Sequence, residues 1–221
     1  ILATALICGI GNICTSFMDY QMRDEIQSSG SFYATFTDID KEKASVITKS
    51  SGVSEYGYKK NLGSVIWDKK NSTSLNVFDK NTINSFQITL KKGSYPKNES
   101  ELIVTQDLLN KWNKKIGDKI TLNLGELIYD DMGMISKLKN SQKTTFKIVG
   151  TLDKAPYNSK LFAITGFDIN TVNKNEKFDV SICTKNPKDI YNTAISIGKN
   201  IGLVKEDNPK DESYSYDEQT N

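Results

Sequence analysis

Histidine is absent from the 221-residue chain, and only one of its 29 basic residues, Arg23, is an arginine. Without imidazole, Ser-His-Asp triads, Cys-His dyads and histidine-ligated metal sites are excluded. The scarcity of arginine removes the side chain best suited to clamp phosphates or to read base edges. The 29 basic and 27 acidic residues nearly cancel, whereas nucleic-acid binding depends on clustered positive charge. The composition therefore predicts no nucleic-acid partner.

Cysteine is also scarce, and Cys8, Cys14 and Cys183 form no C-x-x-C pair. A zinc ribbon and a thioredoxin-type redox site are therefore excluded. Cys8 and Cys14 lie in an apolar stretch, where a buried structural thiol is the expected role. The sequence contains no phosphate-binding loop, nucleophile elbow or calcium loop. We therefore predict no catalytic residues, no bound cofactor, no metal ligands and no enzymatic activity.

The first 18 residues are far more apolar than the rest of the chain. Residues 1–18 carry no charge, although the mean hydropathy of the whole chain is −0.47. A helix that spans a bilayer needs about 20 apolar residues, so we interpret residues 1–18 as the outer part of a transmembrane helix. One alternative is a buried helix of a soluble protein. The other is the remnant of a signal peptide, which should start with a basic segment, and residues 1–18 contain none.

The helical pattern continues beyond this apolar stretch. Met18, Met22 and Ile26 repeat at a four-residue spacing that keeps one helix face apolar, and Gly30 is expected to end the helix. Residues 19–30 are therefore predicted to form a helical stalk. Met18, Met22 and Ile26 are the candidate residues for packing of this stalk.

Residues 31–204 show the short patterns typical of an α+β domain. Helices are predicted after the capping residue Asp40, with Gly52 as the stop, over residues 106–112, and after Asn186 and Pro187. Residues 82–90 are ambiguous. Strands are predicted where apolar and polar residues alternate, at residues 31–38, 53–60, 63–68, 74–78, 101–105, 119–124, 145–153, 160–165 and 178–184. The expected fold class is α+β, with a mixed or antiparallel sheet and a few short helices.

Two segments of this body have a special composition. Residues 125–143 look like an insertion that concentrates apolar and methionine side chains, and such adaptable segments often contact partners. We predict an exposed contact surface there, formed by Tyr129, Met132, Met134 and Ile135; the alternative is that the segment folds onto the domain. Residues 205–221 are polar and acidic, and they are predicted to be a loose segment or a linker.

The order of several motifs resembles a known family. The segment Gly52 to Tyr58 reads GVSEYGY, and it is followed by KGSYPKNESELIVT (Lys92 to Thr105), KIGDKITL (Lys115 to Leu122) and FKIVGT (Phe146 to Thr151). Together with the apolar start, this run resembles the extracytoplasmic domain of FtsX-like ABC transporter permeases, often called the MacB-like periplasmic core domain. The resemblance extends over nearly the whole chain.

The resemblance implies a function that the residues alone do not. It implies a domain outside the cell membrane, in a permease that works as a homodimer or heterodimer, with residues 205–221 as a linker toward a next membrane helix. The face of Met18, Met22 and Ile26 would then pack against a partner stalk in the dimer. Cross-linking through Met22→Cys in the assembled membrane protein tests this contact, and absence of a dimer adduct would count against it. A separate cytoplasmic ATP-binding cassette subunit would supply ATP hydrolysis, coupled to export, extraction or regulation of a partner outside the membrane. The alternatives are a single-span extracellular receptor or sensor domain without an ATPase, and a surface-anchored hydrolase with a polar pocket. A kinase or a stop codon after residue 221 would favour the receptor.

Overall fold

A computed structural model describes residues 26, 30–156, 159–203 and 214–216. The predicted membrane span at residues 1–18 and nearly all of the predicted stalk and linker lie outside the described residues. Among the residues described, none of the helices combines the length and the apolar character of a bilayer-spanning segment.

The described chain forms one mixed sheet of ten strands with short helices on it, which confirms the predicted fold class. The sheet order is β10-β1-β9-β2-β3-β8-β5-β7-β4, and β6 pairs with β2 and β7. The helices are α2 (Lys41–Thr48), α3 (Lys80–Ser85), α4 (Gln106–Lys111), the 3₁₀ turn η2 (Pro187–Asp189) and α5 (Ile190–Asn200). The strands are β1 (Ala34–Ile39), β2 (Val53–Ile66), β3 (Ser72–Phe78), β4 (Thr89–Gly93), β5 (Glu101–Thr105), β6 (Lys119–Tyr129), β7 (Ile135–Lys154), β8 (Ala163–Gly166), β9 (Phe178–Thr184) and β10 (Tyr214–Tyr216).

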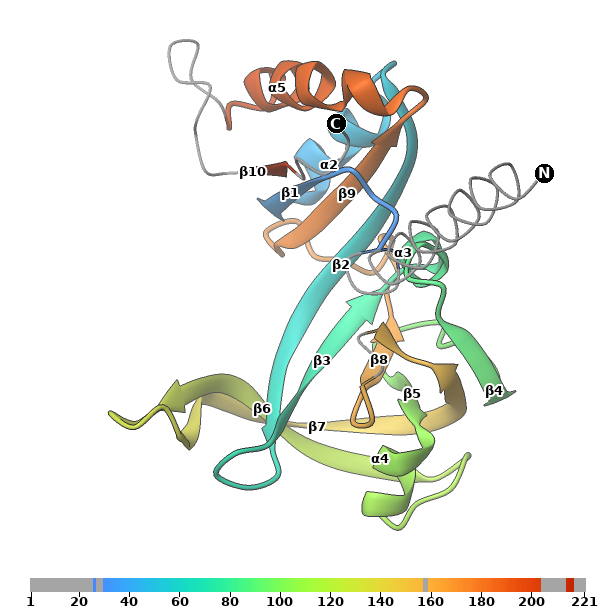
Figure 1. The fold of residues 1–221 in the computed structure, drawn as a ribbon, viewed down its shortest axis with the longest axis vertical. Helices are drawn as coiled ribbons and strands as arrows, with labels where there is room; N and C mark the ends of the chain where they lie inside the picture. The colour runs from blue at the N-terminus through green and yellow to red at the C-terminus, as the bar shows by residue number, and fades with distance from the viewer. Residues whose placement is uncertain (1–25, 27–29, 157–158, 204–213, 217–221) are drawn as a thin grey trace, which may run out of the picture.

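Strand β2 runs from the part of the molecule with α5 to the crossing with β6 and β7, and it joins two lobes (Figure 1). Its first half pairs with β9 and its second half with β3. We call the part made of β1, β9, β10, α2 and α5 the terminal lobe, because the described body begins and ends there. The part made of β4 to β8 and α4 is the hairpin lobe, named after the long β6–β7 hairpin.

The continuity of β2 corrects the prediction of two separate strands at residues 53–60 and 63–68. The register between β2 and β3 shifts between Asn61 and Ser64, and Gly63 lies there at a φ of +110°. Glycine adopts this backbone conformation without a steric penalty. Gly63 therefore marks a bulge within one strand, where the sequence indicated a turn between two.

Local capping signals define the helices of the terminal lobe. The Asp40 side chain accepts a hydrogen bond from the Lys43 backbone N–H at 2.9 Å, as predicted for the start of α2. The predicted stop at Gly52 is wrong, since α2 ends at Thr48 with Lys49 as its C-cap. Asn186 caps η2 as predicted. The helices α2 and α5 cover the buried core of this lobe, which includes Phe36, Ile47, Val180, Ile182, Ile190, Ala194 and Ile197.

The hairpin lobe is built around β6 and β7. Ile120 of β6 lies opposite Phe146 of β7. Gly117 precedes β6 at a φ of +98°, which glycine adopts without a steric penalty. Residues 125–143 form the outer part of this hairpin and the turn at its end. Helix α4 and strands β5 and β8 close a core that includes Leu102, Val104, Leu108, Leu122, Phe146 and Ile148.

The ambiguous residues 82–90 belong to a short helix and an edge strand. Asp79 caps α3, because its side chain accepts the Thr82 N–H at 2.9 Å, and β4 follows three residues after Phe86. Ile83 of α3 lies in a third buried cluster with Phe78, Ile103, Leu152 and Ile164. This cluster therefore packs α3 against strands β5, β7 and β8 of the hairpin lobe.

Candidate functional site

The two lobes meet where β2 crosses the base of the β6–β7 hairpin. We call this region, residues 59–66 of β2 and the segments that contact them, the waist. Ser64 of β2 pairs with Gly125 of β6. A Cβ atom at Gly63 would lie 2.9 Å from the backbone N of Gly125, so the two backbones touch without a side chain between them. The close approach therefore depends on the missing side chain of Gly63, whereas a Cβ at Gly125 would lie 2.6 Å from the carbonyl oxygen of Lys139 in β7.

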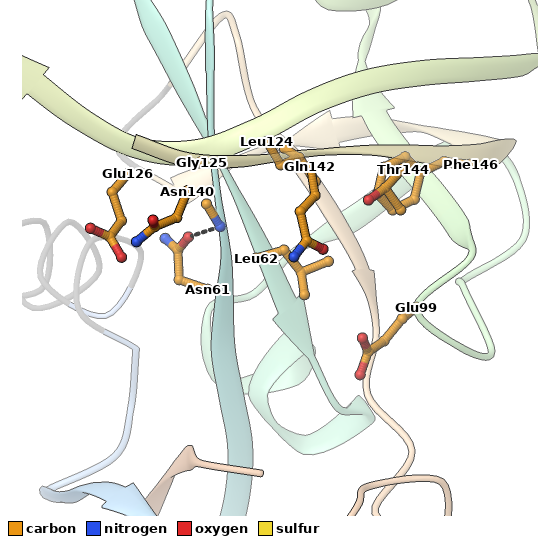
Figure 2. Close-up of a pocket in the computed structure, with 11 residues that line it drawn as sticks. Asn61, Leu62, Glu99, Leu124, Gly125, Glu126, Asn140, Gln142, Thr144 and Phe146 are labelled. Atoms are coloured by element: carbon orange, nitrogen blue, oxygen red, sulfur yellow. Dashed lines mark hydrogen bonds between the residues drawn. The ribbon is translucent and has the colours of Figure 1, made fainter. Parts of the chain in front are cut away.

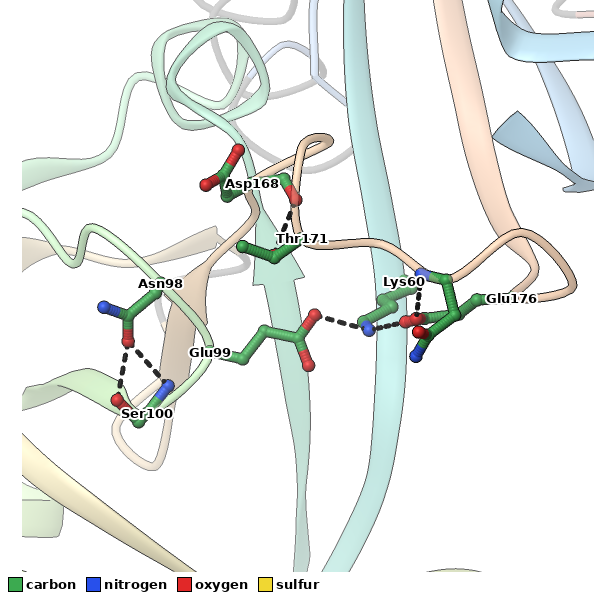
Figure 3. A network of polar contacts seen from close by, with 8 residues as sticks. Lys60, Asn98, Glu99, Ser100, Asp168, Thr171 and Glu176 are labelled. Atoms are coloured by element: carbon green, nitrogen blue, oxygen red, sulfur yellow. Dashed lines mark hydrogen bonds and ion pairs between the residues drawn. The ribbon is translucent and has the colours of Figure 1, made fainter. Parts of the chain in front are cut away.

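A nearly buried lysine with two carboxylates occupies the waist (Figure 3). The Nζ atom of Lys60 lies 2.5 Å from a carboxylate oxygen of Glu99 and also pairs with Glu176. The Lys60 side chain is only 10% exposed, against 36% for Glu99 and 27% for Glu176. Glu99 comes from the segment before β5, and Glu176 from the segment before β9. The ion pairs thus link β2 to a segment of the hairpin lobe and to the segment that returns to the terminal lobe.

The electrostatics of Glu176 show that this pairing is favourable. Burial alone would raise the pKa of Glu176, but the hydrogen bond from Lys60 and the backbone N–H of Asn173 together hold it below its usual value. The charged form of Glu176 is therefore stabilised in the fold.

An open crevice of about 650 Å³ lies beside this lysine, between β2 and the hairpin (Figure 2). Its apolar floor is formed by Leu62, Leu124 and Phe146. Its polar lining consists of three amides, one hydroxyl and two carboxylates, contributed by Asn61, Asn140, Gln142, Thr144, Glu99 and Glu126. We call this space the waist crevice.

The predicted contact surface lies at the end of the hairpin. Tyr129 is 56% exposed and Met132 is 85% exposed, whereas Met134 is half-buried and Ile135 is only 7% exposed. The backbone N–H of Ile135 donates to the carbonyl of Lys69 in the β2–β3 turn at 2.9 Å. Tyr129 and Met132 therefore form an exposed apolar tip, while Ile135 is packed and does not offer a contact surface.

The predicted stalk face is described at one position only. Met18 and Met22 lie outside the described residues, and Ile26 is half-buried. The carbonyl of Ile26 accepts a hydrogen bond from the backbone N–H of Gly30 at 2.9 Å, and Gly30 has a φ of +82°. This hydrogen bond and the positive φ are typical of a helix end at Gly30.

The waist residues were not found by sequence reasoning. Lys60 and Glu176 are separated by 116 positions, and neither belongs to a motif. Other features give little sign of bond chemistry: within the described residues no group of three acidic, cysteine or histidine side chains could hold a metal ion. Burial raises the pKa of the Cys183 thiol to about 11, so this thiol is not activated as a nucleophile.

Comparison with known proteins shows what the fold is. No protein-family model matches the sequence, and no curated protein matches it significantly. Among solved structures, the extracellular domain of the noncanonical ABC-type transporter YknZ from Gram-positive bacteria matches with a TM-score of 0.51 and 13% identity, over 84% of this chain and 98% of that domain.

Two further solved structures match at lower scores. The periplasmic region of MacB from Actinobacillus actinomycetemcomitans has a TM-score of 0.49 and 10% identity, over 86% of this chain and 90% of that one. A domain of a putative permease from Porphyromonas gingivalis has a TM-score of 0.45 and 12% identity, over 76% of this chain and 79% of that one. The likeness to YknZ confirms, at the level of the fold, the resemblance indicated by the sequence motifs: the chain has the fold of the extracellular domain of an ABC-type transporter.

Proposed function

We propose that the chain is the extracellular part of an ABC transporter permease subunit, which couples ATP hydrolysis in a separate cytoplasmic subunit to work outside the membrane. The observation that carries this proposal is the shared fold, which covers 98% of the YknZ extracellular domain. One sequence feature supports it: residues 1–18 are uncharged and can enter a bilayer. The work outside the membrane is export, extraction or regulation of a partner, and the permease acts as a homodimer or heterodimer.

Co-purification tests this proposal. The full-length gene, tagged on this chain, is expressed together with the ATP-binding cassette gene next to it and purified from membranes. We expect the ATP-binding subunit to co-purify in a fixed ratio, with ATPase activity that disappears when its phosphate-loop lysine is replaced by alanine. If no ATP-binding subunit co-purifies, and a kinase or a stop codon follows the domain, the chain is a single-span receptor or sensor instead.

The exposed tip of the hairpin is proposed to contact a protein partner outside the membrane. Figure 1 shows the β6–β7 hairpin projecting to one side of the molecule, in the half away from α5. Its tip therefore lies away from the terminal lobe. Tyr129 and Met132 combine large apolar area with adaptable shape, which suits a contact with another protein.

The variant with Tyr129→Ser and Met132→Ser separates contact from stability. Because both side chains are exposed, we expect the free energy of unfolding to change by less than about 0.5 kcal/mol. Affinity for the partner should fall on the order of tenfold. The full-length variant should therefore fail to restore the phenotype of a deletion strain, which is the measurement. Val46→Ser, at a 46% exposed position on α2, is the matched control. Full complementation by the tip variant would contradict a contact role.

A further inference from the structure

The outer face of the β6–β7 hairpin, at its base, is polar and positively charged. Residues 119–123 of β6 lie opposite residues 143–147 of β7 there. Alternate positions on these strands are buried or half-buried over the core of the hairpin lobe, and the positions between them are exposed. We call the exposed side the lysine face. Its positions are Lys119, Thr121, Asn123, Lys143, Thr145 and Lys147.

Two lysines of the lysine face lie directly opposite each other. Lys119 pairs with Lys147 in the register of β6 and β7, and like charges at directly opposite positions destabilise an antiparallel pair. A third lysine, Lys143, lies opposite Asn123 on the same face. The chain as a whole is nearly neutral, with 29 basic and 27 acidic residues, so the excess of positive charge is local. A local conflict of this kind is typical of a position that serves a purpose other than stability.

The positive charges of the lysine face are not neutralised within the described part of the protein. None of the ion pairs among the described residues includes Lys119, Lys143 or Lys147. Glu101 of β5 lies beside Lys147 in the parallel β5–β7 register, but its carboxylate accepts the backbone N–H of Lys97 at 2.8 Å. The three ammonium groups can therefore be approached by an external anion.

The spacing of the lysines favours an anion with several charged groups. Lys143 and Lys147 are separated by four residues of β7, which is about 13 Å along an extended strand. A single phosphate cannot contact both ammonium groups at that separation. A flexible chain that carries a phosphate on each repeat can contact all three lysines.

The other groups of the lysine face narrow the chemistry of this chain. The hydroxyls of Thr121 and Thr145 share one hydrogen bond at 2.8 Å, and with the amide of Asn123 they can still bond to the hydroxyls and phosphate oxygens of a ligand. The six positions include no aromatic ring and no arginine, so a nucleic acid would gain neither base stacking nor a bidentate phosphate clamp. They include no large apolar side chain, which is unlike the centre of a protein–protein interface.

We propose that the lysine face binds a linear polyol phosphate, a hydrophilic polymer whose phosphodiester groups contact Lys119, Lys143 and Lys147 and whose hydroxyls contact the threonines and the asparagine between them. Figure 1 shows β6 and β7 in the half of the molecule away from α5, so the polymer lies along the hairpin lobe. This inference goes beyond the proposed function, because it requires neither an ATPase nor a membrane.

Fluorescence anisotropy with a fluorescein-labelled glycerol phosphate decamer tests the site in the detergent-solubilised 221-residue chain. We expect saturable binding at low salt, which weakens about tenfold when the three lysines of the face are replaced together, because ionic contacts supply most of the affinity. This variant carries Lys119→Gln, Lys143→Gln and Lys147→Gln. The matched control removes three exposed charges in and before α5 and should leave the affinity within about twofold. It carries Lys185→Gln, Lys188→Gln and Lys199→Gln.

A charge reversal separates binding from folding. Lys119→Glu places a carboxylate opposite Lys147, and an opposite-charge pair at this register stabilises the two strands. We therefore expect the midpoint of urea denaturation, followed by tryptophan fluorescence, to rise in this variant, whereas its affinity for the decamer falls about tenfold. An unchanged affinity together with a raised midpoint would mean that the opposed lysines have no role in binding.

Several further outcomes would overturn the proposal. Equal loss of affinity in the control around α5 would mean that general surface charge attracts the polymer. Tighter binding of phosphatidylglycerol vesicles than of the decamer would identify a lipid surface as the ligand, because both carry the same glycerol phosphate group. Tighter binding of a thymidine decamer would identify a nucleic acid. Absence of saturable binding at low salt would remove the site altogether.

Discussion

Lys60→Met is expected to destabilise the protein by about 2 kcal/mol at pH 7. The substitution keeps the length and apolar stem of a side chain that is 10% exposed, but it leaves Glu99 and Glu176 near each other without the cation. Breaking a buried ion pair costs about 3–5 kcal/mol, and the partial exposure of the two carboxylates reduces this. Trp67 and Trp112, whose rings contact in the hairpin lobe, provide a fluorescence signal for urea denaturation.

The pH dependence of this effect has a defined sign. The pKa of Glu176 is lowered from 4.5 in the fold, so its ion pair contributes stability above that value, which is lost as the pH falls through the folded pKa. The difference between the wild type and Lys60→Met should therefore shrink below about pH 4.5. Lys174→Met is the matched control, because the Lys174–Glu42 pair is 78% and 74% exposed and should have almost no effect on stability. Equal effects of both variants would mean that the waist ion pairs are no more important than surface pairs.

Gly63→Ala should lower the free energy of unfolding by about 3 kcal/mol. Two costs combine there. The φ of +110° is strained for any residue with a Cβ, and the new methyl would lie 2.9 Å and 3.0 Å from backbone atoms of Gly125. Backbone atoms cannot rotate away as a side chain does, so β2 and β6 must separate.

Gly133→Ala distinguishes the two costs. Gly133 also has a positive φ, +72°, but nothing lies within 4 Å of the Cβ it would carry. Gly133→Ala should lower the free energy of unfolding by only about 1 kcal/mol, which is the cost of the positive φ alone. The difference between the two variants in urea denaturation measures the close approach of the backbones. If both lose the same stability, the contact between Gly63 and Gly125 has no energetic role.

Elements with a local signal were predicted well from the sequence. The cap at Asp40, the Asn186–Pro187 start and the strand at residues 178–184 depend on neighbouring residues only, and all three are confirmed. Helix α3 had such a signal in Asp79, but six residues are too few for a clear apolar period. The prediction divided β2 into two strands because a glycine is as typical of a turn as of a bulge. The pairing of β2 with β3 and β6 decides for the bulge.

The waist could not be predicted, for a different reason. Lys60, Glu99 and Glu176 come from three distant segments, and each alone is an ordinary surface-type residue. Their proximity is set by how β2 crosses the sheet, which no local pattern encodes. The hairpin tip was partly foreseen: the concentration of apolar residues indicated an unusual segment, but it did not reveal that Ile135 points inward while Tyr129 and Met132 remain exposed.

The single strand that belongs to both lobes has a mechanical consequence. Two domains joined by a loop can swivel independently, and a torque applied to one is dissipated in the loop. Here β2 itself joins the lobes: its ladder with β9 reaches Lys59, where its ladder with β3 begins, and the one irregularity of the β3 ladder is the bulge at Gly63. A tilt of the terminal lobe is therefore transmitted through β2 to the hairpin lobe, unless hydrogen bonds along this strand break.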